Sequence, residues 1–220
     1  MNRIMKLEIQ NKTFKQKGFS ILNDFELEVQ TGEKVSIIGE SGVGKTSLLN
    51  ILGLLDTQYE GSYELFGSVV NELSRNKLAE WRNQKIGFVL QDSALIHSLT
   101  IEDNIKLPLM YANIEKDRNA QEHFERIVQK IGIESILKKK PHECSGGQRS
   151  RAVFARAIMM NPQIILSDEP KASLDSKNKE KIIDLLFEMN NEFNTTIITV
   201  THDLDVANRH DRIITLEMNE

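Results

Sequence analysis

The sequence predicts an α/β domain in which a mostly parallel β-sheet is covered by helices on both faces. Four short stretches are rich in Ile, Val and Thr and nearly continuously apolar, as are the strands of a buried parallel sheet: residues 35–38, 164–166, 196–200 and 213–216. Apolar residues recur between them at helical spacing, for example at Ile182, Leu185, Leu186 and Met189. Such alternation of buried strands and amphipathic helices is typical of layered α/β domains.

Two further elements complete the predicted architecture. Residues 25–29 alternate between apolar and acidic side chains, which predicts a half-exposed strand, and we expect the N-terminal strands to form a second, antiparallel layer. Residues 92–160 contain no strand-like stretch, and their apolar residues follow helical spacing at Ala120, Phe124, Ile127 and Ile131. We interpret residues 92–160 as a helical subdomain inserted into a single domain that spans residues 1–220.

The composition argues against several classes of protein. The 220 residues include 28 Lys and Arg and 32 Asp and Glu, and the net charge of −4 predicts no nucleic-acid partner. The single cysteine, Cys144, excludes an internal disulfide and a multi-cysteine zinc cluster, so we expect a reducing, intracellular environment. No apolar stretch approaches the ~20 residues that a membrane-spanning helix needs, and the first residues lack the apolar core of a signal peptide.

Residues 39–46 fit the pattern G-x-x-x-x-G-K-[ST] between a predicted buried strand and an apolar helix at residues 48–55. The glycines let backbone N–H groups converge on one anion, and the helix N-terminus adds its dipole. Lys45 is then expected to reach the β- and γ-phosphates of a nucleotide and the Thr46 hydroxyl to bind Mg²⁺; the alternative is a glycine-rich turn before a core helix. The residues expected to bind the nucleotide here are Gly39, Glu40, Ser41, Gly42, Val43, Gly44, Lys45, Thr46 and Ser47.

A second element places two carboxylates after a predicted buried strand. Asp168 and Glu169 follow residues 164–166, and α/β sheets bind ligands at the carboxyl ends of their strands. Asp168 is predicted to hold Mg²⁺ through water, and Glu169 to polarise the water that attacks the γ-phosphate. Alone, such a pair is most often a solvated turn, but together with the phosphate loop it predicts a nucleoside triphosphatase.

A third motif lies upstream of the carboxylates, at residues 144–148. The serine and glutamine of this motif have the spacing of a capping box at the start of a helix. The N–H groups at this helix end can have one of two roles: they are capped for structural reasons alone, or they bind an anion. With these motifs in this order, the chain resembles the ATP-binding subunits of ABC transporters, whose signature is L-S-G-G-Q; a cysteine replaces the leucine here. The signature residues expected to contact ATP are Ser145, Gly146, Gly147 and Gln148.

The resemblance implies roles for four more residues. Gln91 matches the Q-loop glutamine, which binds Mg²⁺ and contacts the membrane partner. Asp175 ends the S-L-D of the D-loop and is expected to contact the nucleotide. His202 matches the switch histidine that touches the γ-phosphate. Phe14 occupies the position of the aromatic residue that stacks on adenine; its alternative is a core phenylalanine.

One branch of the family is the most similar. Residues 78–82, 85–91 and 100–109 look like the lipoprotein-release and macrolide-exporter branch, which also contains antimicrobial-peptide-resistance ATPases. Three positions besides the cysteine depart from the family pattern: Lys171 replaces a threonine, and Arg149-Ser150 replaces a glutamine pair. None of these departures touches Lys45, Asp168, Glu169 or His202, so we expect an active ATPase. The predicted catalytic residues are Lys45, Gln91, Glu169 and His202.

The family fold is that of a P-loop NTPase, and its working unit is an ATP-bound, head-to-tail homodimer. The resemblance implies that Ser145 and Gly147 of one chain then cover the γ-phosphate that Lys45 of the other chain holds. The resemblance further implies an integral membrane transporter subunit as partner and a cytoplasmic, peripheral location on the inner face of the cell membrane. Two alternatives are a soluble ABC-type ATPase that acts on ribosomes or DNA, and a small-molecule P-loop kinase. A kinase gives no role to Gln91, His202 or the signature.

Overall fold

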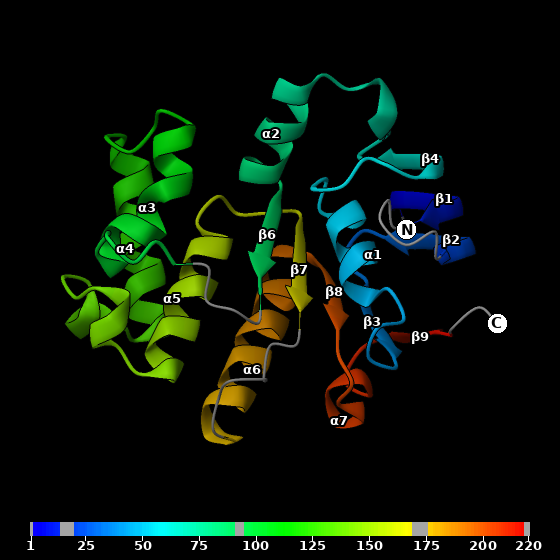
Figure 1. Ribbon diagram of the computed structural model, residues 1–220. Helices are drawn as coiled ribbons and strands as arrows, with labels where there is room; N and C mark the ends of the chain where they lie inside the picture. The colour runs from blue at the N-terminus through cyan, green and yellow to red at the C-terminus, as the bar shows by residue number, and fades with distance from the viewer. Residues whose placement is uncertain (1, 14–19, 91–94, 169–175, 218–220) are drawn as a thin grey trace.

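A parallel sheet forms the centre of the molecule, in a computed structural model that describes residues 2–13, 20–90, 95–168 and 176–217. Its strand order is β6-β7-β8-β3-β9, and every neighbouring pair is parallel. Figure 1 shows the arrows of β6, β7 and β8 side by side and pointing the same way. The strands are β6 (Ile86–Val89), β7 (Ile164–Asp168), β8 (Thr196–Val200), β3 (Lys34–Gly39) and β9 (Arg212–Leu216).

The second layer is an antiparallel sheet of order β2-β1-β4-β5. Its strands are β1 (Arg3–Thr13), β2 (Ser20–Gln30), β4 (Glu60–Leu65) and β5 (Ser68–Val69). Leu27 and Val29 of β2 are buried, whereas Glu26 and Glu28 are exposed, as the alternating pattern predicts. The two sheets together confirm the predicted fold class.

Helix α1 (Lys45–Leu52) packs between the two sheets (Figure 1). One face of the helix is fully buried, and it joins a single core with residues of β1, β4 and the parallel strands. The Tyr63 hydroxyl of β4 donates a hydrogen bond of 3.0 Å to the Leu52 carbonyl, which fixes the end of the helix against the antiparallel sheet. The buried residues of α1 are Leu48, Leu49, Ile51 and Leu52.

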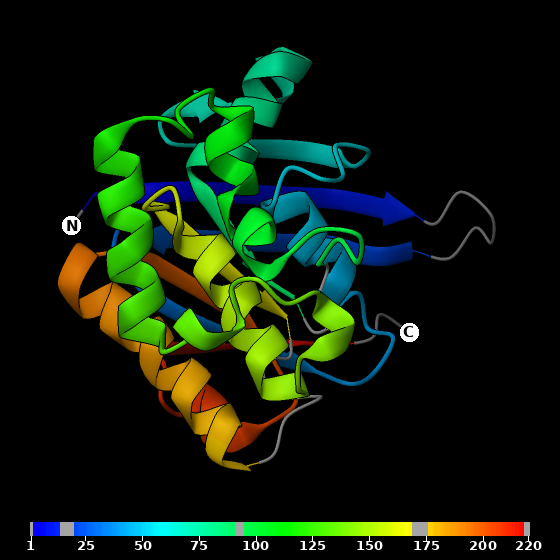
Figure 2. The same cartoon turned by 90° about the vertical axis from the view of Figure 1, so that its left-hand side faces the viewer.

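Most of the remaining helices cover the opposite face of the parallel sheet (Figures 1 and 2), whereas the helix at residues 75–84 lies near the start of β6 and packs Leu78 and Trp81 into the same core as α1. Ile165 and Ile197 point into this second core, while Leu166 and Ile198 point into the first. Burial on both faces explains why β7 and β8 are almost continuously apolar. The helices are α2 (Arg75–Gln84), α3 (Ile101–Tyr111), α4 (Arg118–Ile131), α5 (Gly146–Ile158), α6 (Ser176–Phe193) and α7 (Leu204–Ala207). Short 3₁₀ turns lie at Val70–Glu72, Glu134–Ile136 and Pro141–Glu143.

Two sequence expectations need correction. β9 lies at the edge of the parallel sheet, so it is paired on one side only, and Ile213 is 39% exposed where a buried strand is expected. The apolar helix expected at residues 48–55 ends at Leu52, because Gly53 follows as its cap and Leu54 adopts a positive φ of 59°. Of the helices in the described ranges, none has the length and apolar character needed to cross a membrane.

Candidate functional site

Three strands of the parallel sheet, β3, β7 and β8, end at the same carboxyl edge because their register aligns them. Val200, at the end of β8, lies opposite both Asp168 of β7 and Ile37 of β3. The pairing continues past β8, where the Thr201 N–H donates to the Ile37 carbonyl at 3.0 Å. The phosphate loop, Asp168 and His202 therefore follow adjacent strands at one edge, where α/β sheets bind ligands.

The backbone of the phosphate loop has the shape that an anion site requires. Gly42 and Gly44 have φ values of +88° and +105°, which side chains rarely allow. A Cβ on Gly39 would lie 2.7 Å from the Leu216 carbonyl oxygen, so glycine also lets β9 approach the loop. Helix α1 begins at Lys45 with no acidic residue in its first turn and no side chain capping it within the described part of the chain. Its first N–H groups and its dipole therefore face the loop.

Lys45 is folded back onto this loop. Its Nζ donates hydrogen bonds of 2.7 Å to the carbonyl oxygens of both Gly39 and Glu40. Carbonyl oxygens are neutral acceptors, and an anionic phosphate oxygen forms a stronger, charge-assisted bond with an ammonium group. The cation is thus held over the loop by contacts that a phosphate can replace.

Thr46 and Asp168 provide a donor set that fits Mg²⁺. The Thr46 side chain is exposed in the first turn of α1, and Asp168 is half-buried at the end of β7. The described residues contain no group of three His, Cys, Asp or Glu side chains that could hold a metal by themselves. Mg²⁺ prefers oxygen ligands and keeps waters and substrate phosphates in its shell, so one hydroxyl and one carboxylate suffice.

Five residues discussed above lie outside the described residues, and their roles stay predictions. Four of them carry predicted site roles and one is a departure from the family pattern. They are Phe14, Gln91, Glu169, Asp175 and Lys171.

The signature motif starts helix α5 with the predicted capping box. The Ser145 Oγ accepts from the Gln148 N–H at 3.3 Å, and the Gln148 Oε1 accepts from the Ser145 N–H at 2.9 Å. Ser145 is exposed, and Gly147 is buried. The N-terminus of α5 is therefore capped and still accessible from solvent on its serine side.

The signature does not lie beside the phosphate loop of the same chain. Helix α5 packs against α3 and β6, and strands β7 and β8 separate β6 from β3. At about 4.8 Å between neighbouring strands, β6 and β3 are roughly 14 Å apart. Figure 1 shows α5 on the β6 side of the sheet and α1 on the β3 side. The signature and the phosphate loop of one chain therefore lie on opposite sides of strands β7 and β8.

Cys144 has the environment of a packing residue. Its side chain is 5% exposed, its Sγ lies 3.5 Å from the Lys140 carbonyl oxygen, and burial raises the pKa of the thiol. A buried, protonated thiol is a poor nucleophile. We expect Cys144→Leu to hydrolyse ATP at the parental rate or faster, and Cys144→Ala to stay close to it. Phosphate release at saturating Mg-ATP checks this, and loss of hydrolysis in both variants would show that the thiol is needed.

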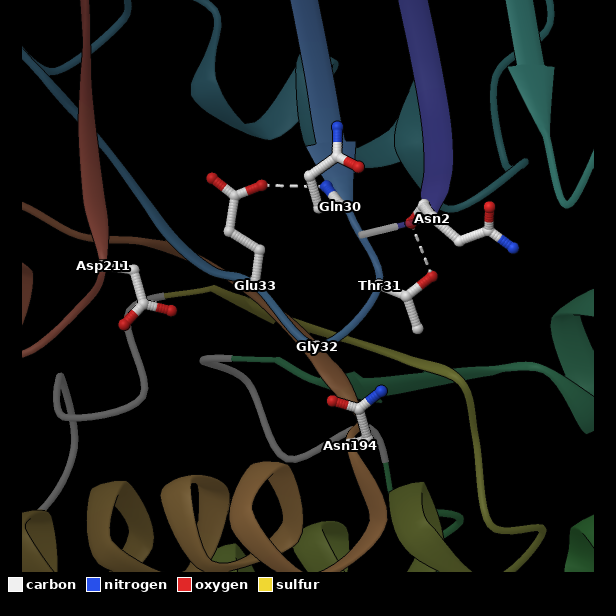
Figure 3. A pocket seen from close by; sticks show the side chains of 7 residues that line it. All are labelled: Asn2, Gln30, Thr31, Gly32, Glu33, Asn194 and Asp211. Atoms are coloured by element: carbon white, nitrogen blue, oxygen red, sulfur yellow. Dashed lines mark hydrogen bonds between the residues drawn. The ribbon is translucent and has the colours of Figure 1, made fainter.

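The opposite edge of the parallel sheet carries a hollow of about 720 Å³ between the two sheets (Figure 3). Its carboxylates are bound within the chain. Glu33 accepts from the Gln30 N–H and the Arg212 Nε at 2.8 Å each, and Asp211 accepts from the Lys34 N–H at 2.9 Å. The hollow is a polar junction of the sheets and lies away from the phosphate loop. Its lining residues are Asn2, Gln30, Thr31, Gly32, Glu33, Asn194 and Asp211.

Sequence reasoning did not single out His210, whose ring the structure places between Thr199 of β8 and Val206 of α7. It is buried, and both of its ring nitrogens have partners 2.9 Å away. A lone histidine outside any motif carries no signal in the sequence, and its contacts depend on how β8, α6 and α7 pack.

Comparison with known proteins agrees with this geometry. Residues 22–172 match the family model of ABC transporters. The chain is 40% identical over 194 residues to a bacitracin export ATP-binding protein of Halalkalibacterium halodurans, BceA, covering 88% of this chain and 76% of that protein. It is also 40% identical over 201 residues to the macrolide export ATP-binding/permease protein MacB of Mannheimia succiniciproducens, covering 91% of this chain but only 31% of MacB.

A solved structure has the same fold. The dimeric ATP-binding cassette MJ0796, in a post-hydrolysis state with ADP and Pi, superposes with a TM-score of 0.85 at 36% identity, covering 97% of this chain and 94% of that one. The family match spans more than half of the chain, and both relatives are exporter ATP-binding proteins, the branch that the sequence predicts. The chain belongs to the ABC transporter family, as an ATP-binding and ATP-hydrolysing subunit.

Proposed function

We propose that this chain drives a membrane exporter by closing and opening a head-to-tail dimer around two molecules of Mg-ATP. The observation that carries the proposal is the separation within one chain between the phosphate loop after β3 and the signature at the start of α5, beside β6. A second chain, rotated head to tail, supplies the missing signature to each phosphate loop. The dimeric cassette MJ0796 has the same fold, which supports this arrangement.

The binding step uses groups that already face the loop. The Lys45 ammonium exchanges the carbonyl oxygens of Gly39 and Glu40 for oxygens of the β- and γ-phosphates. The Thr46 hydroxyl and Asp168 would hold Mg²⁺, which would supply positive charge to the phosphates. The N–H groups at the start of α1 face the same anion.

Hydrolysis requires a base for the attacking water, a hydrogen-bond donor to the γ-phosphate, and a second copy of the chain that closes over the site. We propose that Glu169 accepts a proton from the attacking water, and that His202 donates a hydrogen bond to the γ-phosphate. Ser145 and Gly147 of the second chain cover the same phosphate. Phosphoryl transfer of this kind depends on positioning and charge stabilisation, so loss of any of these groups lowers the rate strongly.

In this proposal, a membrane partner uses the closing motion of the dimer to drive export. We propose an integral membrane subunit that docks near Gln91 and the helical subdomain at residues 92–160, and that holds the chain at the inner face of the cell membrane. The similarity to the exporters MacB and BceA favours this partner over a ribosome or DNA.

Co-purification tests the proposed partner. We expect the tagged chain, recovered from detergent-solubilised membranes of its own host, to bring down one integral membrane protein in fixed proportion. The recovered complex should hydrolyse ATP. Recovery with ribosomes or DNA, and no membrane protein, would favour the soluble ABC-type ATPase instead.

A further inference from the structure

His202 sits in a short connection between two elements of very different rigidity. On one side is β8, which is fully buried and paired with both β3 and β7. On the other side is α7, which has four residues, too few to be stable without tertiary contacts. The contacts that hold α7 against β8 therefore contribute to the position of His202, together with the hydrogen bonds of Thr201 and Asp203 within the turn.

A single buried imidazole joins the two sides. Nδ1 of His210 lies 2.9 Å from the Val206 carbonyl oxygen of α7, and Nε2 lies 2.9 Å from the Thr199 Oγ1 of β8. Thr199 is fully buried. The ring packs edge-on against Phe187 of α6, with centroids 5.2 Å apart. His210 thus links both ends of the segment at residues 199–210, and His202 lies within this segment.

The partners fix the protonation of this ring. A carbonyl oxygen only accepts hydrogen bonds, so Nδ1 carries the proton. Burial lowers the pKa of His210, which favours the neutral imidazole at neutral pH. Nε2 then accepts from the Thr199 hydroxyl. Both bonds are satisfied in one tautomer and one orientation of the ring.

Neighbouring strands provide an internal comparison. Ser36 of β3 and Ser167 of β7 lie opposite Thr199 in the register, and both are fully buried. Their hydroxyl groups have no hydrogen-bond partner among the described residues, whereas the Thr199 hydroxyl bonds His210. Of these three aligned hydroxyl groups, only that of Thr199 forms a hydrogen bond to a residue that follows His202 and α7 in the chain, namely His210.

We infer that His210, through its paired bonds to Thr199 and Val206, is a positioning residue that holds His202 in place for the γ-phosphate. The inference rests on the role proposed above for His202. His210 itself touches no reacting atom, and its effect passes through the geometry of α7 and the turn at residues 201–203.

Steady-state hydrolysis by the full chain tests the inference. His210→Ala should lower kcat by about 10-fold to 100-fold, as displacement of a catalytic group does, and leave the KM for ATP within about twofold because ground-state binding is unaffected. Thr199→Val, which keeps the volume but removes the hydroxyl, should lower kcat in the same direction. Thr199→Ser, which keeps the hydroxyl, should have a kcat close to that of the parent. Ser36→Ala removes a hydroxyl that has no partner among the described residues, so it should leave kcat unchanged.

A double-mutant cycle with His202 distinguishes positioning from general damage. In a His202→Ala background, measured in single turnovers with enzyme in excess, His210→Ala should cause no further loss. An equal loss in both backgrounds would overturn the inference. If His210→Ala does not fold, parental kcat in Thr199→Val would overturn it equally. Parental kcat in His202→Ala alone would instead show that the proposed role of His202 is wrong.

Discussion

Lys45→Ala is expected to abolish ATP hydrolysis and to weaken nucleotide binding. In the structure the ammonium group is held over the phosphate loop by two carbonyl oxygens at 2.7 Å, so it is placed before any phosphate arrives. Backbone N–H groups carry only partial positive charge, so they cannot replace the full charge of the ammonium group beside the phosphates. Removal of one such group from a phosphoryl-transfer site should lower kcat by at least about 100-fold.

A second lysine serves as a matched control. Lys77 of α2 forms an exposed ion pair with Glu80 at 2.8 Å, far along the chain from the phosphate loop. Surface pairs of this kind contribute little to stability, so Lys77→Ala should keep the parental rate. Phosphate release at saturating Mg-ATP, with binding of a fluorescent nucleotide measured alongside, separates catalysis from affinity. Turnover by Lys45→Ala within about twofold of the parent would contradict its role.

The sequence predicted those parts of the fold whose signals are local. β7 and β8 bury both faces, so their continuous apolar character was sufficient to place them in a parallel sheet. β9 has a similar composition, yet its Ile213 is exposed, because edge position depends on strand order and not on the residues of the strand itself. The early end of α1 is set by Gly53 and the positive φ of Leu54 within an otherwise apolar run.

The same distinction applies to the site. The phosphate loop and the capping box of Ser145 and Gln148 are contiguous motifs whose geometry follows from a few residues. The bonds of Lys45 to Gly39 and Glu40 are also local, but they depend on the side-chain conformation that the folded loop selects. The hydrogen bond between His210 and Thr199 joins residues 11 positions apart through a packed core, and no pattern in the sequence indicates such a contact.

Glu169→Gln is expected to bind ATP but to stop hydrolysing it. Glu169 directly follows Asp168, the last residue of β7, at the edge of the sheet that also carries the phosphate loop. Glutamine keeps the volume and one hydrogen-bonding oxygen but cannot accept the proton of the attacking water. The contacts of Lys45, Thr46 and the loop backbone with the phosphates are untouched, so affinity should survive while kcat falls by at least about 100-fold. Hydrolysis at the parental rate would show that another residue is the base.

The Glu169→Gln variant, which should keep its bound ATP intact, also tests the formation of the dimer. In the proposed dimer, closure depends on contacts from Ser145 and Gly147 of one chain to the γ-phosphate bound by the other, and these contacts should persist while ATP stays intact. ADP lacks the γ-phosphate, so the same variant with ADP is the matched control. Protein concentration must be varied, because association without the membrane subunit depends on mass action.

The most direct test of the head-to-tail dimer is the mass of Glu169→Gln by size exclusion with light scattering in Mg-ATP. We predict twice the monomer mass with Mg-ATP, and return to the monomer mass with ADP. A variant that binds ATP, does not hydrolyse it and remains monomeric at every concentration would contradict the shared site between two chains.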